Sequence, residues 1–159
     1  GPTVLALSRQ HLPTMHPDDF PEVTDGPLRG GYILAEAPGG HQPEAIIIAT
    51  GSEVPLALAA REKLADQGRK IRVVSLPSWE IFDQQSQEYR DEVLPPSVKK
   101  RISVEAGISM GWHRFVTDEG RIIAIDHFGA SAPANRLFSE FGFTAENIVK
   151  KVQEMLSMK

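Results

Sequence analysis

The segment from Glu44 to Thr50 reads EAIIIAT, and it constrains the fold more than any other part of the chain. Its residues are apolar on both faces of an extended backbone, whereas a strand with one solvated face alternates apolar and polar residues. Such a run is typical of a central strand that helices cover on both sides. The sequence therefore predicts a parallel sheet inside an α/β domain.

Strand-like and helical runs alternate from this segment to the end of the chain, and their connections are short enough for right-handed βαβ units. We predict a three-layer α/β/α domain with a mostly parallel sheet of about five strands. The further strands are expected at 71–76, 100–106 and 121–127, and the helical segments at 54–67, 79–94, within 107–116, and twice after 127.

Capping residues mark the expected helix ends. Ser52 is expected to cap the helix 54–67, and Gly68 to close it. Ser78 and Thr144 are expected to cap a later helix and the final helix.

The run from Gly31 to Ala37 reads GYILAEA and precedes the central strand by one turn, Pro38-Gly39-Gly40. The two runs are close enough to pair as a hairpin. We therefore expect the 31–37 strand to be the one antiparallel strand of the sheet.

The chain before Gly31 has a different character. Thr3 to Ser8 is a short apolar run of strand length, and a polar exit with Pro13 follows it. Residues 14–30 are rich in proline, glycine and aspartate and contain few spaced apolar residues, so we interpret them as a linker. Because the chain begins Gly1-Pro2 and runs directly into a strand, we expect it to be a piece of a larger protein.

Composition narrows the classes of partner. The 159 residues carry a formal net charge of −4, and both signs are interspersed along the chain, so no face favours nucleic acid or anionic lipid. There is no cysteine, which excludes disulfides and thiolate catalysis and favours a cytoplasmic enzyme. No apolar run is long enough to cross a membrane. A small molecule or another protein is the expected partner.

Gly107-Ile108-Ser109-Met110-Gly111 matches the G-x-S-x-G nucleophile elbow of α/β-hydrolases, with Ser109 as the nucleophile. Asp126 and His127 follow in the right order. Adjacent residues on a strand point to opposite faces, however, so Asp126 is badly placed to orient the imidazole of His127. We favour a glycine-bounded turn and keep an esterase as an alternative.

Two further positions have both a structural and a functional interpretation. Thr50 to Glu53 offers backbone N–H groups to an anion, but the Glu53 carboxylate occupies the same place, so we favour helix capping. Arg9 follows a strand at the expected ligand-binding edge of a sheet, and its planar fork suits a phosphate. Exposed arginines are also common without any ligand. The five histidines have no zinc-binding spacing, and no metal site is expected.

Several segments together resemble the transketolase family. The resemblance covers nearly the whole chain and includes Arg9 within 1–13. It is strongest in 49–54 (ATGSEV), 73–85 (VVSLPSWEIFDQQ), 104–107 with 111–112, and 126–134 (DHFGASAPA). His11 and His127 depart from the asparagine and arginine that are usual in the family.

The resemblance implies an enzyme of the pentose phosphate pathway that transfers a two-carbon ketol unit between sugar phosphates. It implies a homodimer that uses thiamine diphosphate and a divalent metal, Mg or Ca, both bound outside this chain. Residues 1–13 would end the pyrimidine-binding domain, 14–30 would be the linker, and 31–159 would form the C-terminal domain. Arg9 would bind the terminal phosphate of the substrate, with no catalytic, cofactor or metal residue in this chain. The chain alone would be inactive and would serve structure or dimer assembly, with a regulatory or anion-binding module as the alternative.

Overall fold

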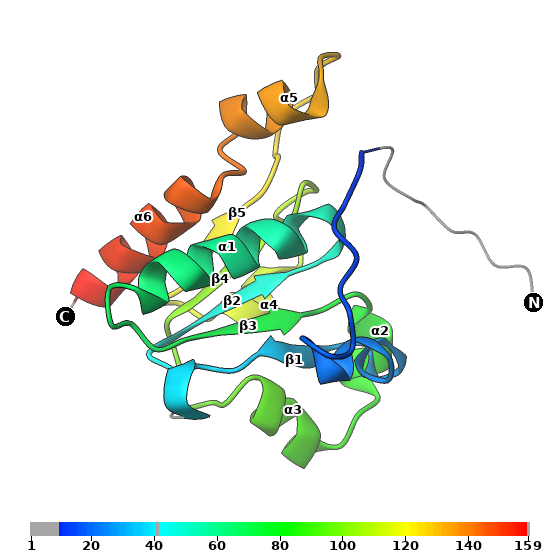
Figure 1. The fold of residues 1–159 in the computed structure, drawn as a ribbon, viewed down its shortest axis with the longest axis vertical. Helices are drawn as coiled ribbons and strands as arrows, with labels where there is room; N and C mark the ends of the chain where they lie inside the picture. The colour runs from blue at the N-terminus through cyan, green and yellow to red at the C-terminus, as the bar shows by residue number, and fades with distance from the viewer. Residues whose placement is uncertain (1–9, 41, 159) are drawn as a thin grey trace, which may run out of the picture.

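The computed structural model describes residues 10–40 and 42–158 (Figure 1). The predicted strand Thr3 to Ser8 lies outside this part of the chain. The strands are β1 (Tyr32–Ala35), β2 (Ala45–Ala49), β3 (Ile71–Ser75), β4 (Arg101–Val104) and β5 (Arg121–Ile123). The α-helices are α1 (Val54–Ala65), α2 (Trp79–Asp83), α3 (Gln87–Val93), α4 (His113–Val116), α5 (Ala134–Glu140) and α6 (Ala145–Ser157), and the 3-10 helices are η1 (Pro21–Val23), η2 (Gly26–Arg29), η3 (Pro38–Gly40) and η4 (Gly51–Glu53).

The five strands form one sheet in the order β1-β3-β2-β4-β5. β2 lies in the centre and pairs in parallel with β3 on one side and with β4 on the other. All five of its side chains are buried, as the two-faced apolar run predicts. The three-layer domain with a mostly parallel five-stranded sheet is therefore confirmed.

The predicted hairpin between the first two strands is wrong, although the first strand is antiparallel. β1 pairs with β3, where Ile33 lies opposite Val74. Both edges of β2 are occupied by parallel neighbours, so no edge remains for β1. The side chains of β1 alternate between buried and half-buried, which suits the edge of the sheet better than its centre.

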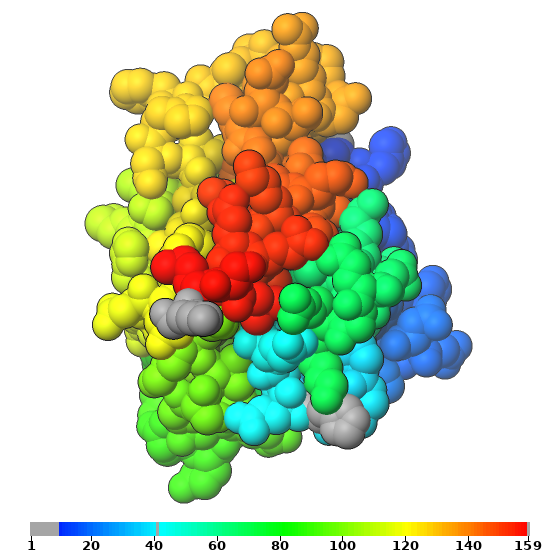
Figure 2. All heavy atoms as spheres, turned by 90° about the vertical axis from the view of Figure 1, so that its left-hand side faces the viewer, coloured from blue at the N-terminus to red at the C-terminus, as the bar shows by residue number. Residues whose placement is uncertain are grey.

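Helices α1 and α6 cover one face of the sheet, and the two views place them side by side (Figures 1 and 2). Thr144 caps α6 as predicted, because its hydroxyl accepts the Asn147 backbone N–H at 3.2 Å. Both helices turn an apolar stripe toward the sheet. The buried residues of this core include Ala57, Ala60 and Leu64 from α1 and Ile148, Val152 and Met155 from α6.

Helices α2, α3 and α4 cover the other face. Trp112, which precedes α4, is fully buried, and its indole lies edge-on to Trp79 with a centroid distance of 5.1 Å. Phe82 and Phe115 pack into the same core, against Ile46 and Ile48 of β2 and Val74 and Leu76 of the β3 segment. Ser78 caps α2 as expected, by accepting the Ile81 backbone N–H.

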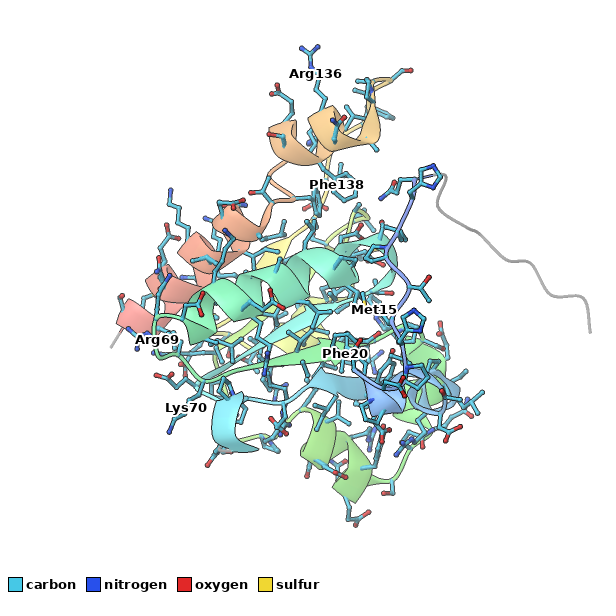
Figure 3. All side chains as sticks on the ribbon, viewed as in Figure 1. Met15, Phe20, Arg69, Lys70, Arg136 and Phe138 are labelled. Atoms are coloured by element: carbon cyan, nitrogen blue, oxygen red, sulfur yellow. The ribbon has the colours of Figure 1, made fainter. Side chains whose placement is uncertain are left out.

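The segment 14–30, predicted to hold no regular element, contains η1 and η2. Met15, Phe20 and Val23 pack against the core that α1 and α6 cover, and Figure 3 shows the first two on the N-terminal segment beside the sheet. A 3-10 helix needs only one turn and tolerates proline at its start, so spaced apolar residues are not required to form it. The expectation that this segment holds no regular element was therefore wrong, and its interpretation as a linker between domains stays a prediction.

Candidate functional site

The carboxyl ends of β2, β4 and β5 meet at one edge of the sheet, where ligands bind in open α/β domains. Polar residues follow each strand at this edge. Ser52 and Glu53 come after β2, Glu105 after β4, and Asp126 after β5. This edge is the candidate site.

Glu53 is a buried carboxylate with an exposed fraction of 3%. The Ser52 hydroxyl donates to one of its oxygens, and the Ala106 backbone N–H donates to the other at 3.0 Å. Burial raises the pKa of Glu53, and the nearby charge of Glu105 raises it further, against the effect of the two hydrogen bonds. The carboxylate thus ties the end of β2 to the end of β4.

The predicted capping role of Ser52 is wrong. The single 3-10 turn η4 separates β2 from α1, so Glu53 occupies the N-cap position of α1, and no side-chain hydrogen bond caps the helix there. The Glu53 carboxylate accepts from the Ser52 hydroxyl and from the Ala106 N–H, and not from the backbone N–H groups of 50–53. Gly68 follows the helix with a φ of 76°, as expected for its closing residue.

Glu105 is held by the indole of Trp112, whose Nε1–H donates to its carboxylate at 2.7 Å. A packing role is the default expectation for a tryptophan, and Trp112 does pack, but it also orients a carboxylate at the candidate edge. Glu105 was not among the site residues predicted from the sequence. Its position directly after a strand was the signal that could have identified it.

The G-x-S-x-G segment is a turn. Asp126 accepts the Ser109 backbone N–H at 2.9 Å, and this contact with the Ser109 N–H and hydroxyl lowers the pKa of Asp126. His127 directs Nδ1 to the Phe128 carbonyl oxygen and stacks edge-on with Phe141. Over the described residues, Asp126 and His127 share no hydrogen bond, so the orienting contact of a hydrolase triad is missing.

The hydrogen bond from the Ser109 N–H to Asp126 joins two loops that carry exposed apolar side chains. Ile108 and Met110 lie in one loop, with exposed fractions of 56% and 73%, and Phe128 lies in the other and is 99% exposed. We call these three residues the edge surface. Scattered apolar side chains are normal on a protein surface, but three large ones on joined loops make this surface a candidate for interaction.

A surface hollow of about 590 Å³ continues from the Phe128 loop toward α5. Its lining is mostly small or apolar and comes from Gln10, residues 130–134, Leu137 and Phe138. Phe138 faces the body of the domain, while Arg136 points away from it (Figure 3). The DHFGASAPA segment therefore forms an exposed loop beside a hollow, with no part in the core.

Arg9, the predicted phosphate-binding residue, lies outside the described residues. Within the described ranges, no three histidine, aspartate or glutamate side chains are arranged to hold a metal ion. A search of the same ranges finds no helix with the length and apolar character needed to span a membrane.

Comparison with known proteins identifies relatives over the whole chain. Residues 30–144 match the family described as "Transketolase-like TK C-terminal domain". Transketolase 2 of Escherichia coli K12 is 50% identical over 161 aligned positions, which cover 100% of this chain and 23% of the relative. The transketolase of Geobacillus stearothermophilus is 47% identical and is covered to 23% by 98% of this chain. The chain thus spans about a quarter of the length of these relatives.

Solved structures agree. The transketolase of Leishmania mexicana superposes with a TM-score of 0.75 at 38% identity, over 83% of this chain and 18% of that one. A Pichia stipitis transketolase in complex with sedoheptulose-7-phosphate superposes with a TM-score of 0.73 at 38% identity, over 81% of this chain and 18% of that one. With its fold and sequence both matching, this chain belongs to the transketolase family, and residues 30–144 correspond to the C-terminal domain.

Proposed function

We propose that this chain is the C-terminal part of a transketolase that transfers a two-carbon ketol unit between sugar phosphates. The observation that carries the proposal is the match of residues 30–144 to the C-terminal domain, together with whole-chain identities near one half to enzymes about four times as long. The Pichia stipitis relative is a complex with a sugar phosphate, which supports this class of substrate for the parent enzyme. We further propose a cytoplasmic homodimer as the parent assembly.

The edge of the sheet does not fit thiamine diphosphate or its divalent metal. A diphosphate needs cations or free N–H donors, but Glu53 and Glu105 present carboxylates there, and the Ala106 N–H is already used by Glu53. The described residues also contain no cluster of metal-ligating side chains. We therefore assign the cofactor to parts of the parent enzyme that precede this chain.

The exposed apolar residues of the edge surface are suited to packing against other domains of the parent enzyme. Ile108, Met110 and Phe128 expose apolar area on loops that the Asp126 contact holds together. About three quarters of the length of the relatives lies outside this chain, so a large partner surface is available in the parent. We propose that the edge surface packs against the preceding domains and thereby supports the assembled enzyme.

Calorimetric titration of the isolated chain with thiamine diphosphate and Mg²⁺ tests the first part of the proposal. We expect no saturable heat from the chain and no ketol transfer. Activity is expected when the preceding part of the parent protein is added. Saturable binding in the micromolar range by the chain alone contradicts the assignment of the cofactor to other domains.

Phe128→Ser tests the second part. It is expected to weaken association with the preceding domains by about tenfold to hundredfold, because burying a phenylalanine side chain is worth about 1.5–3 kcal/mol. Leu28→Ser is the matched control, since Leu28 is 74% exposed on η2, outside the edge surface. Equal effects of the two variants, measured by sedimentation or calorimetry, would show that the edge surface is not the contact.

Arg9 is proposed to bind the terminal phosphate of the substrate in the parent enzyme. Arg9→Ala is expected to raise KM for phosphorylated substrates much more than it lowers kcat, because the phosphate charge is the same in the ground state and the transition state. A charge-assisted contact predicts about a tenfold to hundredfold loss in kcat/KM, and Arg9→Lys should recover only part of it. An equal loss with unphosphorylated substrates would contradict this role.

A further inference from the structure

A second pocket, with a volume of about 360 Å³, lies between α2, α3 and α4, on the face of the sheet opposite α1 and α6. It is separate from the edge surface, and its chemistry does not depend on the proposed function. Its lining is rich in charge and has an excess of cations. The cationic side chains are Arg90, Lys99, Arg101 and Arg114, and the carboxylates are Asp83 and Asp91.

Both carboxylates already have partners. One Arg114 nitrogen, Nη2, contacts the two Asp83 oxygens at 2.7 and 2.6 Å. Asp91 accepts a hydrogen bond from the Gln87 amide at 2.7 Å. In the described part of the chain, neither carboxylate forms an ion pair with Arg90 or Arg101.

Arg101 is a buried cation whose hydrogen-bond partners are all neutral. Its exposed fraction is 7%, and burial lowers its pKa, with the charge of Asp91 acting in the opposite direction. A buried charge without a counter-ion in direct contact is costly, so a negative group in the pocket would be stabilised. The four acceptors are the carbonyl oxygens of Leu94, Pro95, Val98 and Phe115, at 2.9–3.0 Å.

Arg90 has an unused donor in the same wall. Its two terminal nitrogens donate to neutral acceptors, the Asp83 carbonyl oxygen at 3.3 Å and the Gln87 side-chain oxygen at 2.8 Å. Its Nε is buried and has no hydrogen-bond partner. A buried N–H without an acceptor is rare in folded proteins and needs an explanation.

Thr117, also in the lining, has a backbone conformation that side chains rarely adopt. Its φ is 62° and its ψ is 176°, in a region populated almost entirely by glycine. Its hydroxyl donates to the Lys99 carbonyl oxygen at 2.6 Å, so the strained residue holds the loop that carries Lys99. Strain of this kind persists where the surroundings impose it, and it is concentrated at functional sites.

We propose that this pocket binds a compact oxyanion of the phosphate type, held by Arg90, Lys99 and Arg114 above the buried charge of Arg101. Guanidinium groups match the geometry of phosphate oxygens, and an oxyanion would offset the excess of cations in the lining. Free phosphate and the phosphate group of a small ester share this chemistry.

Titration of the 159-residue chain with inorganic phosphate at constant ionic strength, followed by amide NMR, tests the proposal. We expect saturable shifts around Arg90 and Thr117, with a dissociation constant of about 1 mM. Arg114→Gln should weaken binding about tenfold, because it removes a cation and frees the Asp83 carboxylate. Asp83→Asn should strengthen binding several-fold, a result that a damaged fold cannot produce.

Arg136→Gln is the matched control, because Arg136 is exposed on α5 and points away from the domain (Figure 3). It should leave the dissociation constant unchanged. Methyl phosphate binding more tightly than inorganic phosphate would identify an ester as the source of the anion, and the reverse order would identify free phosphate. The proposal is overturned if shifts do not saturate, or if all three variants change binding equally.

Discussion

At the scale of single residues, Thr117 allows a test with two variants, alanine and glycine. Their usual order of stability, in which alanine is the more stable, is expected to be reversed at this position. Thr117→Ala and Thr117→Gly both remove the hydroxyl that binds the Lys99 carbonyl oxygen. Only glycine relieves the positive φ, so Thr117→Gly should be more stable than Thr117→Ala by about 1–2 kcal/mol. Urea denaturation measures the difference. A more stable alanine variant would mean that Thr117 is not strained.

Glu53 makes stability depend on pH in a definite direction. Its pKa is raised by burial and by Glu105, so the folded state binds more protons than the unfolded state between the two pKa values. The free energy of unfolding should therefore fall as pH rises through that window, and the cost should persist above it.

Glu53→Gln removes this cost, since its amide oxygen can accept the Ala106 N–H and its NH2 group can donate to the Ser52 hydroxyl. Relative to wild type, the variant should gain stability as pH rises from the ordinary pKa of a glutamate through the raised pKa of Glu53. Chemical denaturation at several pH values checks this, with Glu62→Gln on the exposed surface of α1 as the baseline. If Glu53→Gln loses stability relative to wild type as pH rises, the pKa of Glu53 is not raised.

At the scale of elements, local cues predicted most boundaries because a cap acts within one turn. Thr144 and Ser78 cap the helices that they were expected to cap. Ser52 does not cap α1, because the first turn after β2 is a 3-10 turn. Glu53, the last residue of this turn, accepts a hydrogen bond from Ala106, a residue 53 positions away, which no local pattern shows.

Thr144→Ala should lower the free energy of unfolding by about 1 kcal/mol, since the Asn147 N–H loses its acceptor. Thr144→Ser should retain most of the stability, because it keeps the hydroxyl. Thermal unfolding gives the comparison, and Ser139→Ala on exposed α5 is the control. If the alanine and serine variants are equally destabilised, the cap is not the cause.

At the scale of the whole molecule, strand order predicts the pattern of amide exchange. β2, β3 and β4 each have two neighbours, whereas β1 and β5 lie at the edges. Amide protons in the three inner strands should exchange most slowly, and those in the edge strands faster. NMR should also detect contacts between Ile33 and Val74. Slow exchange in β1 with contacts to β2 would restore the hairpin and contradict this order.

The sequence by itself determined the α/β class, the central position of β2 and two of the three helix caps. These depend on short-range patterns, namely two-faced apolarity in Glu44 to Thr50 and hydroxyls one turn from the N–H groups that they accept. The family resemblance also followed from ordered local segments, and the comparisons confirm it.

Only the tertiary structure decided that β1 joins β3, that Glu53 is buried against Ala106, and that Phe128 and Met110 are carried by joined loops. The pocket proposed to bind an oxyanion is likewise lined by side chains from α3, α4 and β4, which are distant in the sequence. Each of these features depends on which edge or surface remains free after the other elements have packed. The packing of all elements together decides which edges and surfaces remain free, so no local pattern of residues encodes these features.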